Sequence, residues 1–179
     1  MRFTETPIPG AWIIDIEPHA DERGFFARTV CREEFSHYGL NGNMVQQSIS
    51  WNPRKGTLRG MHFQEPPHDE EKLVRVTRGA VYDAIVDLRR ESPAFGRWFG
   101  LELDAEDHRQ LYIPRGVAHG FQTIADDTEV MYEITTPYQA DAARGIRWDD
   151  PTLKIAWPLE ASRIISDRDS GFPFLDDSI

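Results

Sequence analysis

The chain has 179 residues, of which 40% are hydrophobic and 28% charged, and this length and composition predict a single globular domain over residues 1–179. Its formal net charge of −10 argues against a nucleic-acid partner, because binding to phosphate backbones depends on clustered positive charge. No segment approaches the roughly 20 apolar residues of a membrane helix, and the N-terminus lacks the apolar run of a signal peptide. A single cysteine, Cys31, excludes an internal disulfide and favours the cytoplasm as the compartment.

The first third of the chain predicts short strands separated by turns. Residues 12–16 form an apolar run bounded by prolines, which predicts an edge strand or an arm rather than a central strand. A turn at residues 21–24 leads into a strand that begins at Phe25. Residues 32–38 predict one short helix that stops at Gly39, and residues 45–51 predict the next strand.

The most informative stretch is residues 58–64, where apolar and ionisable residues alternate as they do in a strand. Arg59 and His62 would face opposite sides of a regular strand, but Gly60 between them permits a bulge that re-aims side chains.

The remaining elements are also predicted strands, with turns at close spacing. An acidic loop at residues 65–71 precedes runs at 72–76, 81–88, 98–103, 111–113, 120–124 and 129–136. Many short strands and almost no helix favour a β-sandwich or barrel.

Several separate motifs occur in an order that resembles one family. They are DERGFF at residues 21–26, RGMHFQ at 59–64, KLV at 72–74, IPRGVAHGF at 113–121 and WDDP at 148–151. Together they resemble the dTDP-4-dehydrorhamnose 3,5-epimerase family, and the likeness extends from about Asp21 to Asp169. The resemblance implies an all-β, cupin-type jelly roll with a few short helices, whose ligand lies in the barrel mouth. It also implies a homodimer with N-terminal strands reaching across to the partner, and the run at residues 12–16 is compatible with such an arm.

The resemblance assigns four catalytic residues. His62 matches the base, and Asp169 matches the acid that hydrogen-bonds to it and thereby fixes the imidazole tautomer. Tyr132 matches the proton donor on the far face of the sugar, and Lys72 matches a cation near the reacting carbonyl. The implied chemistry is proton abstraction α to a 4-keto group followed by reprotonation from the opposite face, which needs no redox cofactor and no metal. From the residues alone, Asp169 would be a solvated turn residue and Tyr132 a packed strand aromatic.

A second set of residues matches positions that bind a nucleotide-diphosphate sugar. Arg59, Arg23 and His119 match residues that hold the diphosphate and sugar, and an arginine fork suits phosphate. Phe26 could stack on a nucleobase, Gln47 could hydrogen-bond to its edge, and Tyr138 is expected to line the sugar pocket. Arg28 stands where many members carry a glutamate near the base, so a cytidine- or guanosine-diphosphate sugar remains an alternative to a thymidine-diphosphate one.

Three other functions compete with a 3,5-epimerase. A metal-dependent cupin would use His119, but Phe63 and Gln64 follow His62 where a His-x-His pair is required. A 3,4-ketoisomerase would act on the same nucleotide sugars in a similar barrel. A non-catalytic sugar-binding jelly roll would need the pocket arginines and aromatic residues but neither the base nor the donor. Related enzymes epimerise only C3, only C5 or both, and the sequence does not separate them.

Overall fold

The computed structural model describes residues 1–159 and 163–175, and in this part of the chain β-strands dominate. Two short α-helices, α1 (Arg32–His37) and α2 (Asp167–Ser170), and the 3-10 helix η1 (Ala140–Ala142) complete the elements. The strands are β1 (Arg2–Glu5), β2 (Trp12–Asp15), β3 (His19–Asp21), β4 (Gly24–Phe26), β5 (Gln46–Asn52), β6 (Leu58–Gln64), β7 (Lys72–Arg78), β8 (Ala80–Asp87), β9 (Trp98–Asp104), β10 (Gln110–Ile113), β11 (Val117–Thr123), β12 (Thr128–Ile134) and β13 (Ala143–Gly145).

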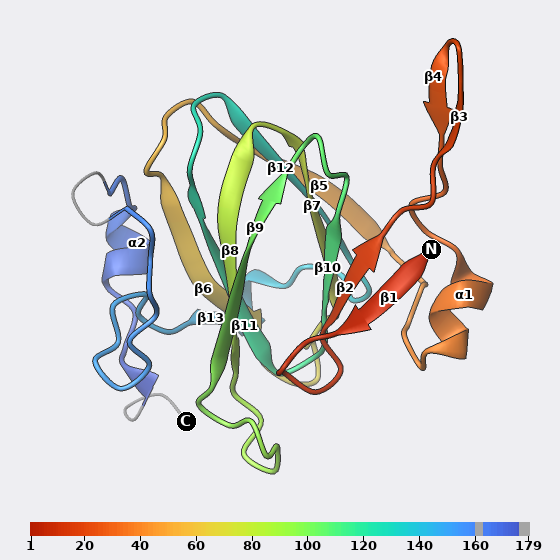
Figure 1. Cartoon of the computed structure of the whole chain (residues 1–179). Helices are drawn as coiled ribbons and strands as arrows, with labels where there is room; N and C mark the ends of the chain where they lie inside the picture. The colour runs from red at the N-terminus through yellow and green to blue at the C-terminus, as the bar shows by residue number, and fades with distance from the viewer. Residues whose placement is uncertain (160–162, 176–179) are drawn as a thin grey trace.

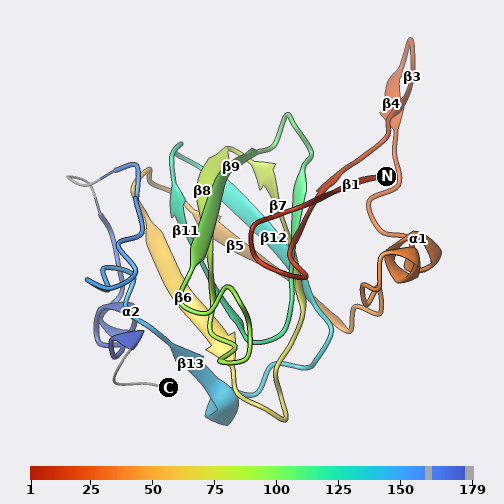
Figure 2. The same cartoon turned by 60° about the horizontal axis from the view of Figure 1, so that its bottom comes forward.

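Two antiparallel sheets face each other and form the body of the molecule (Figure 1). The first has the strand order β1-β2-β10-β7-β12-β5, and the second has the order β13-β6-β11-β8-β9. The prediction of an all-β fold of short strands with few helices is confirmed. Because β6 lies in one sheet while β7 and β12 lie in the other, residues far apart in the sequence meet between the sheets (Figure 2).

Three apolar clusters hold these layers together. The largest lies between the sheets and includes Val74 and Leu111 of the first sheet and Ile85 of the second. Another packs the outer face of the second sheet against the C-terminal segment, and a third packs α1, through Phe35, on the outer face of the first sheet. Burial of these side chains, worth about 1.5–3 kcal/mol each, fixes the two sheets relative to each other.

A bulge interrupts the pairing of β6 with β11. His119 pairs with His62 and Phe121 pairs with Arg59, so that two residues of β6 oppose Gly120 alone. The backbones are very close there, since a Cβ added to Gly60 would lie 2.5 Å from the Cα of Gly120. Gly60 also has a φ of 123°, a region that side chains disfavour. The extra residue gives Arg59 and His62 the same facing, as the bulge hypothesis required.

The strand at the N-terminus differs from the prediction. β2 is not an edge strand or an arm, because it pairs with β1 on one side and with β10 on the other. Its flanking prolines, Pro9 and Pro18, lie outside the strand and remove no hydrogen bond from the ladder.

The projecting element is instead the hairpin of β3 and β4, which we call the arm (residues 19–26). It stands away from both sheets in both cartoon views (Figures 1 and 2).

Candidate active site

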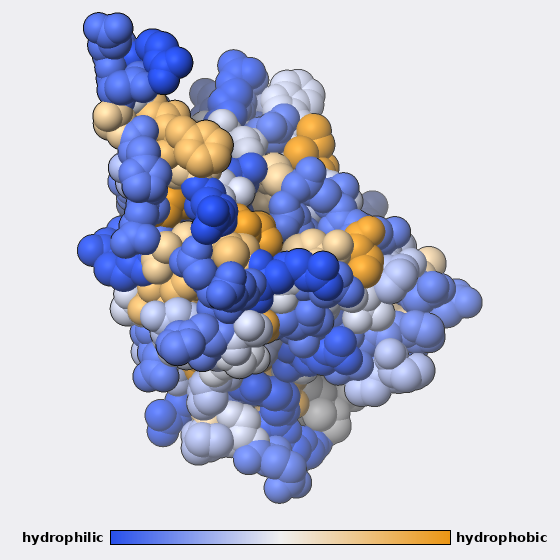
Figure 3. Space-filling model, turned by 90° about the vertical axis from the view of Figure 1, so that its right-hand side faces the viewer, coloured by the Kyte–Doolittle hydropathy of each residue, from blue (hydrophilic) through white to orange (hydrophobic). Residues whose placement is uncertain are grey.

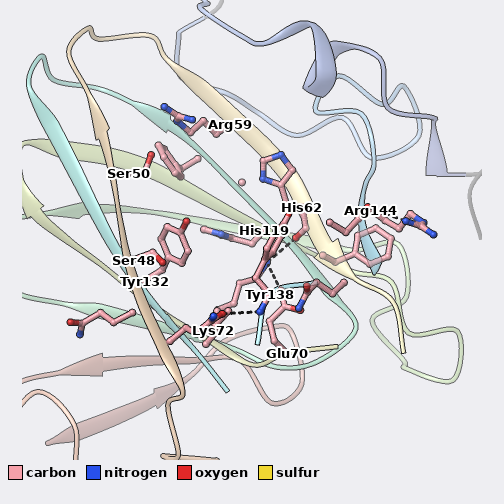
Figure 4. A pocket seen from close by; sticks show the side chains of 18 of the residues that line it. Ser48, Ser50, Arg59, His62, Glu70, Lys72, His119, Tyr132, Tyr138 and Arg144 are labelled. Carbon is pink, nitrogen blue, oxygen red and sulfur yellow. Dashed lines mark hydrogen bonds and ion pairs between the residues drawn. The ribbon is translucent and has the colours of Figure 1, made fainter. Parts of the chain in front are cut away.

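A cavity of about 630 Å³ opens between the two sheets (Figure 4). Its walls come from β5, β7 and β12 of the first sheet and from β6 and β11 of the second. The lining residues that carry polar or aromatic groups are Gln46, Gln47, Ser48, Ser50, Arg59, His62, Phe63, Gln64, Glu70, Lys72, His119, Phe121, Tyr132, Tyr138, Arg144 and Arg168. Among the predicted site residues, His62, Lys72, Tyr132, Gln47, Arg59, His119 and Tyr138 therefore share one cavity.

His62 and Asp169 form a hydrogen-bonded pair. The His62 Nε2 lies 2.9 Å from Asp169 Oδ1, and the other carboxylate oxygen accepts a hydrogen bond from the Gly60 backbone N–H at 3.0 Å. Asp169 is buried on α2, where the Ser166 hydroxyl caps the helix by accepting from the Asp169 N–H. An ionised carboxylate only accepts, so Nε2 carries the proton and Nδ1 is left as the basic nitrogen.

The environment of Asp169 shifts its pKa. Burial alone would raise the pKa of Asp169, but the hydrogen bonds from His62 and Gly60 and the charge of His62 outweigh burial and lower it. Asp169 therefore stays ionised, as an acceptor that fixes the His62 tautomer must be.

Tyr132 reaches the cavity from the opposite sheet. It lies on β12, in register with Ser48 of β5, whereas His62 lies on β6 of the second sheet. Figure 4 shows His62 and Tyr132 on facing walls. The site thus offers an imidazole and a phenol to two sides of a bound molecule.

Lys72, at the start of β7, is almost completely enclosed in the wall of the first sheet. Its Nζ donates to the His62 backbone carbonyl at 3.0 Å and forms an ion pair with Glu70 Oε1 at 3.0 Å. The cation is therefore held close to the backbone of the residue that matches the base.

Arg59 and His119 supply further polar groups to the second sheet's wall. Arg59 lines the cavity, and its Nε donates to Asn52 Oδ1 at 2.8 Å, a hydrogen bond that does not use the two terminal guanidinium nitrogens. His119 lies within β11, a strand that begins at Val117 rather than at the predicted residue 120, and its Nε2 lies 2.9 Å from the completely buried Asp83. Two histidine–carboxylate pairs thus border the same cavity.

The two remaining cavity residues from the prediction lie at its rim. Gln47 is in contact with the cavity, but its amide hydrogen-bonds to Glu133 of the neighbouring strand. Gln46 has the inward parity of Ser48 and Ser50, and its Oε1 accepts from the Tyr138 N–H at 2.7 Å. Gln46 is therefore placed at least as well as Gln47 to meet a ligand, and Tyr138 is anchored at the rim through it.

Three predicted binding residues lie outside this cavity, on or beside the arm. Arg23 is 85% exposed and pairs only with Asp21 of the same hairpin at 2.5 Å, as far as residues 1–159 and 163–175 show. Phe26 is 74% exposed. Arg28, just after the arm, forms an ion pair with Glu34 of α1 at 3.3 Å. In a single chain these residues do not meet His62.

Sequence reasoning missed several residues that the structure brings to the site. Asp83 stands behind His119, Gln64 and Glu70 stand behind Lys72, and Arg144 and Arg168 line the cavity from the C-terminal segment. Arg168 could have been predicted from the sequence, because it is adjacent to the predicted catalytic residue Asp169. The acidic loop gave no sign of which carboxylate turns inward. In the described ranges, no group of three or more His, Cys, Asp or Glu residues is arranged to hold a metal ion, and no helix there is long and apolar enough to cross a membrane.

Comparison with known proteins identifies the family. A family model described as dTDP-4-dehydrorhamnose 3,5-epimerase matches residues 5–177. The protein of that name from Methanothermobacter thermautotrophicus is 44% identical over 172 residues, covering 94% of this chain and 91% of the relative. The crystal structure of the enzyme from Elizabethkingia anophelis superposes with a TM-score of 0.97 at 37% identity, covering 99% of this chain and 98% of the other. The Legionella pneumophila epimerase, solved in complex with dTDP-4-keto-L-rhamnose, gives 0.93 at 35% identity, covering 99% and 94%. The fold is thus the cupin-type jelly roll that the resemblance implied, and the chain belongs to the dTDP-4-dehydrorhamnose 3,5-epimerase family.

Proposed function

We propose that the protein is an isomerase that epimerises a nucleotide-diphosphate 4-keto-6-deoxy sugar, with dTDP-4-keto-6-deoxy-glucose as the first candidate substrate and dTDP-4-keto-rhamnose as the product. The observation that carries the proposal is the placement of the carboxylate-bound His62 and of Tyr132 on facing walls of one cavity. A base on one side and a proton donor on the other are what inversion at a carbon requires. A ring opening or a hydride transfer would not need this pair.

The proposed reaction moves one proton onto the enzyme and one off it. His62 Nδ1 removes the proton from the carbon next to the 4-keto group, and the electron pair of that C–H bond becomes an enolate. Lys72 stabilises the enolate oxygen, where charge appears only as the proton leaves. Tyr132 then donates its proton to the opposite face of the same carbon. His62 and Tyr132 recover their starting protonation states by exchange with solvent before the next turnover.

Arg59 and His119 are proposed to bind the diphosphate and the sugar. The terminal guanidinium nitrogens of Arg59 can donate two parallel hydrogen bonds to phosphate, because only its Nε is engaged by Asn52. The identity of the nucleobase in the substrate is a separate part of the proposal. Arg28 pairs with Glu34 and presents a cation where many family members carry a glutamate, so cytidine- and guanosine-linked sugars remain alternatives to the thymidine-linked one.

We further propose that the active unit is a cytoplasmic homodimer in which each arm reaches the cavity of its partner. The arm exposes Phe25 by 50% and Phe26 by 74%, and apolar groups are visible along it and on the face below it (Figure 3). On β5, the edge strand of the first sheet, Ile49 and Trp51 are more than half exposed and face away from the cavity. Apolar groups of this size beside a free sheet edge favour an interface. The single Cys31 suits a reducing compartment.

The test is incubation with dTDP-4-keto-6-deoxy-glucose in deuterium oxide, with the sugar ring protons followed by NMR. Loss of signal at both C3 and C5 supports a 3,5-epimerase, and loss at one carbon narrows the activity to a mono-epimerase. His62→Asn is expected to slow the exchange by about 10²–10⁴-fold, whereas His37→Asn on the surface helix α1 serves as the matched control. A 4-hydroxy 3-keto product would identify a 3,4-ketoisomerase. If the protein binds a thymidine-, cytidine- or guanosine-linked sugar tightly but exchanges no ring proton of any of them, it is a non-catalytic sugar-binding module.

A further inference from the structure

Glu70 is a buried carboxylate in the wall of the cavity. It belongs to the acidic loop of residues 65–71, yet its side chain is only 6% exposed and it lines the cavity beside Lys72 (Figure 4). One of its oxygens, Oε1, lies 3.0 Å from Lys72 Nζ, and the other, Oε2, accepts from Gln64 Nε2 at 2.9 Å. Removing a carboxylate from water is costly unless it is paired and hydrogen-bonded, and both conditions are met here.

The hydrogen-bonding pattern around Glu70 admits only an acceptor. The Gln64 side chain cannot turn its carbonyl toward Glu70. Its Oε1 accepts from the Gln139 N–H at 2.6 Å, and the Gln64 Nε2 also donates to the His68 carbonyl at 2.9 Å. A glutamine at position 70 would have to face either Lys72 or Gln64 with an N–H against an N–H. The site is therefore built for an ionised glutamate.

The loop around Glu70 is fixed on both sides. Its neighbours Asp69 and Glu71 form ion pairs with Arg115, and the Glu71 backbone N–H donates to Thr135 Oγ1 at 3.0 Å. At the other end of the loop, Glu65 forms an ion pair with Arg144 at 2.9 Å. The position of Glu70 is thus set by the scaffold and not by Lys72 alone.

The ammonium of Lys72 has three N–H groups, and residues 1–159 and 163–175 use two of them. One donates to the His62 carbonyl and one to Glu70, so the third is left for the cavity that Lys72 lines. We propose that Glu70 is a positioning residue for Lys72: it holds the ammonium so that this third N–H meets the substrate oxygen on which negative charge develops. The proposal rests on the proposed epimerase function and specifies how its enolate is stabilised.

The first test measures the position of Lys72 without any turnover. The chain has three lysines, Lys55, Lys72 and Lys154, of which Lys55 and Lys154 are exposed. In a pulse of an amine-acylating reagent followed by peptide mass spectrometry, Glu70→Gln is expected to raise the labelling rate of Lys72 several-fold and to leave Lys55 and Lys154 unchanged. Glu71→Gln, the adjacent carboxylate outside the cavity, is the matched control. An unchanged Lys72 rate in Glu70→Gln overturns the proposal, even if the protein proves to be an epimerase.

The second test asks whether Glu70 acts through Lys72. Displacement of a catalytic group by about 1 Å can cost up to about a hundredfold, so Glu70→Gln is expected to lower kcat by about tenfold or more with KM changed less than twofold. In a Lys72→Met background the same substitution should cost nothing further. An equal loss in both backgrounds would show a merely structural role and overturn the proposal. If wild-type protein exchanges no sugar protons while the labelling difference holds, the proposed function fails and the positioning role stands.

Discussion

The acidic loop (residues 65–71) and the arm (residues 19–26) are similar in length and both carry several charged residues, but they differ in where those charges find their partners. In the loop, Glu65, Asp69, Glu70 and Glu71 each pair with a cation from another element of the same chain. In the arm, the one described ion pair joins Arg23 to Asp21 within the hairpin itself. The arm touches the body through Phe25, whose ring lies 5.1 Å from that of His108.

The loop and the arm therefore differ in whether one chain is enough to complete their contacts. The charged residues of the loop all find their partners within one chain, and we propose that one of them, Glu70, positions Lys72 for the chemistry. The arm carries Arg23 and Phe26, two residues that match the binding of diphosphate and base, yet in one chain it offers them to solvent. In the proposed dimer the chemistry therefore depends on one chain, and part of the binding depends on the arm of its partner. This division can be tested from both sides.

The largest effect is expected from variants of the arm. A protein with Arg23→Glu and Phe26→Ala should lose about a hundredfold in kcat/KM, because a phosphate contact and a stacking contact worth about 1–3 kcal/mol each are removed. Mixing this variant with His62→Asn should restore activity, since one site of each mixed dimer combines an intact cavity with an intact arm. Random exchange would yield about a quarter of the wild-type sites, measured as turnover after joint refolding.

The outcome of mixing decides where the arm acts. If each arm served its own chain, every site in the mixture would keep one defect and no activity would return. A mixture of His62→Asn with the surface variant His37→Asn provides the reference for activity that survives joint refolding, because about half of its sites have an intact cavity and stay active whichever arm serves them.

An intermediate effect concerns the His62–Asp169 pair, which like the loop is completed within one chain. The pKa of Asp169 is lowered in the folded state, so ionised Asp169 stabilises the fold at pH values above the ordinary aspartate range. This stabilisation is lost as the pH falls through the lowered pKa. At pH 7, Asp169→Asn should therefore unfold more easily than the wild type, by about 1.5–3 kcal/mol, the usual worth of hydrogen bonds to a charged group.

Urea unfolding of both proteins from pH 7 down to below pH 3 checks this sign. The two free energies of unfolding should converge at the acid end, where wild-type Asp169 is protonated and resembles asparagine. A difference that stays constant with pH would mean that the charge of Asp169 contributes nothing.

The smallest effect is expected from the outer charges of the loop. Glu71→Gln weakens a half-exposed ion pair with Arg115 and a contact to Thr135, so the free energy of unfolding should fall by about 1 kcal/mol or less and the melting temperature by about 2–4 °C. Turnover should stay within twofold of the wild type. A large loss of turnover in Glu71→Gln would break the distinction between the inward Glu70 and its outward neighbours.

Local patterns in the sequence predicted most of the strands. Alternation located β6 and β8 to within a residue or two, and the one predicted helix, α1, ended next to Gly39 as expected. The error at β2 has a physical reason, because prolines weaken a strand only where they remove a ladder hydrogen bond, and here they lie outside it.

The site was less accessible to sequence reasoning. The resemblance assigned His62, Lys72, Tyr132 and Arg59 to the site, and they share one cavity. Apart from Asp169, it did not reveal the residues that hydrogen-bond or ion-pair with the cavity residues. Asp83 is an ordinary strand residue until the pairing of β8 with β11 brings it to His119. Glu70 lies only two positions from Lys72, but nothing in the acidic loop marks it as the carboxylate that pairs with this lysine. Gln46 could have been preferred to Gln47 from strand parity alone, since it shares the facing of Ser48 and Ser50.

The bulge at Gly60 has a genetic consequence. Loss of one codon between Arg59 and His62 would remove the extra residue and restore a regular strand, in which the two side chains, now two positions apart, would still face the cavity together. The core residues of the other strands would be untouched. The facing of His62 therefore survives such a deletion, whereas loss of the bulge without loss of a residue would turn the imidazole to the opposite face of the strand.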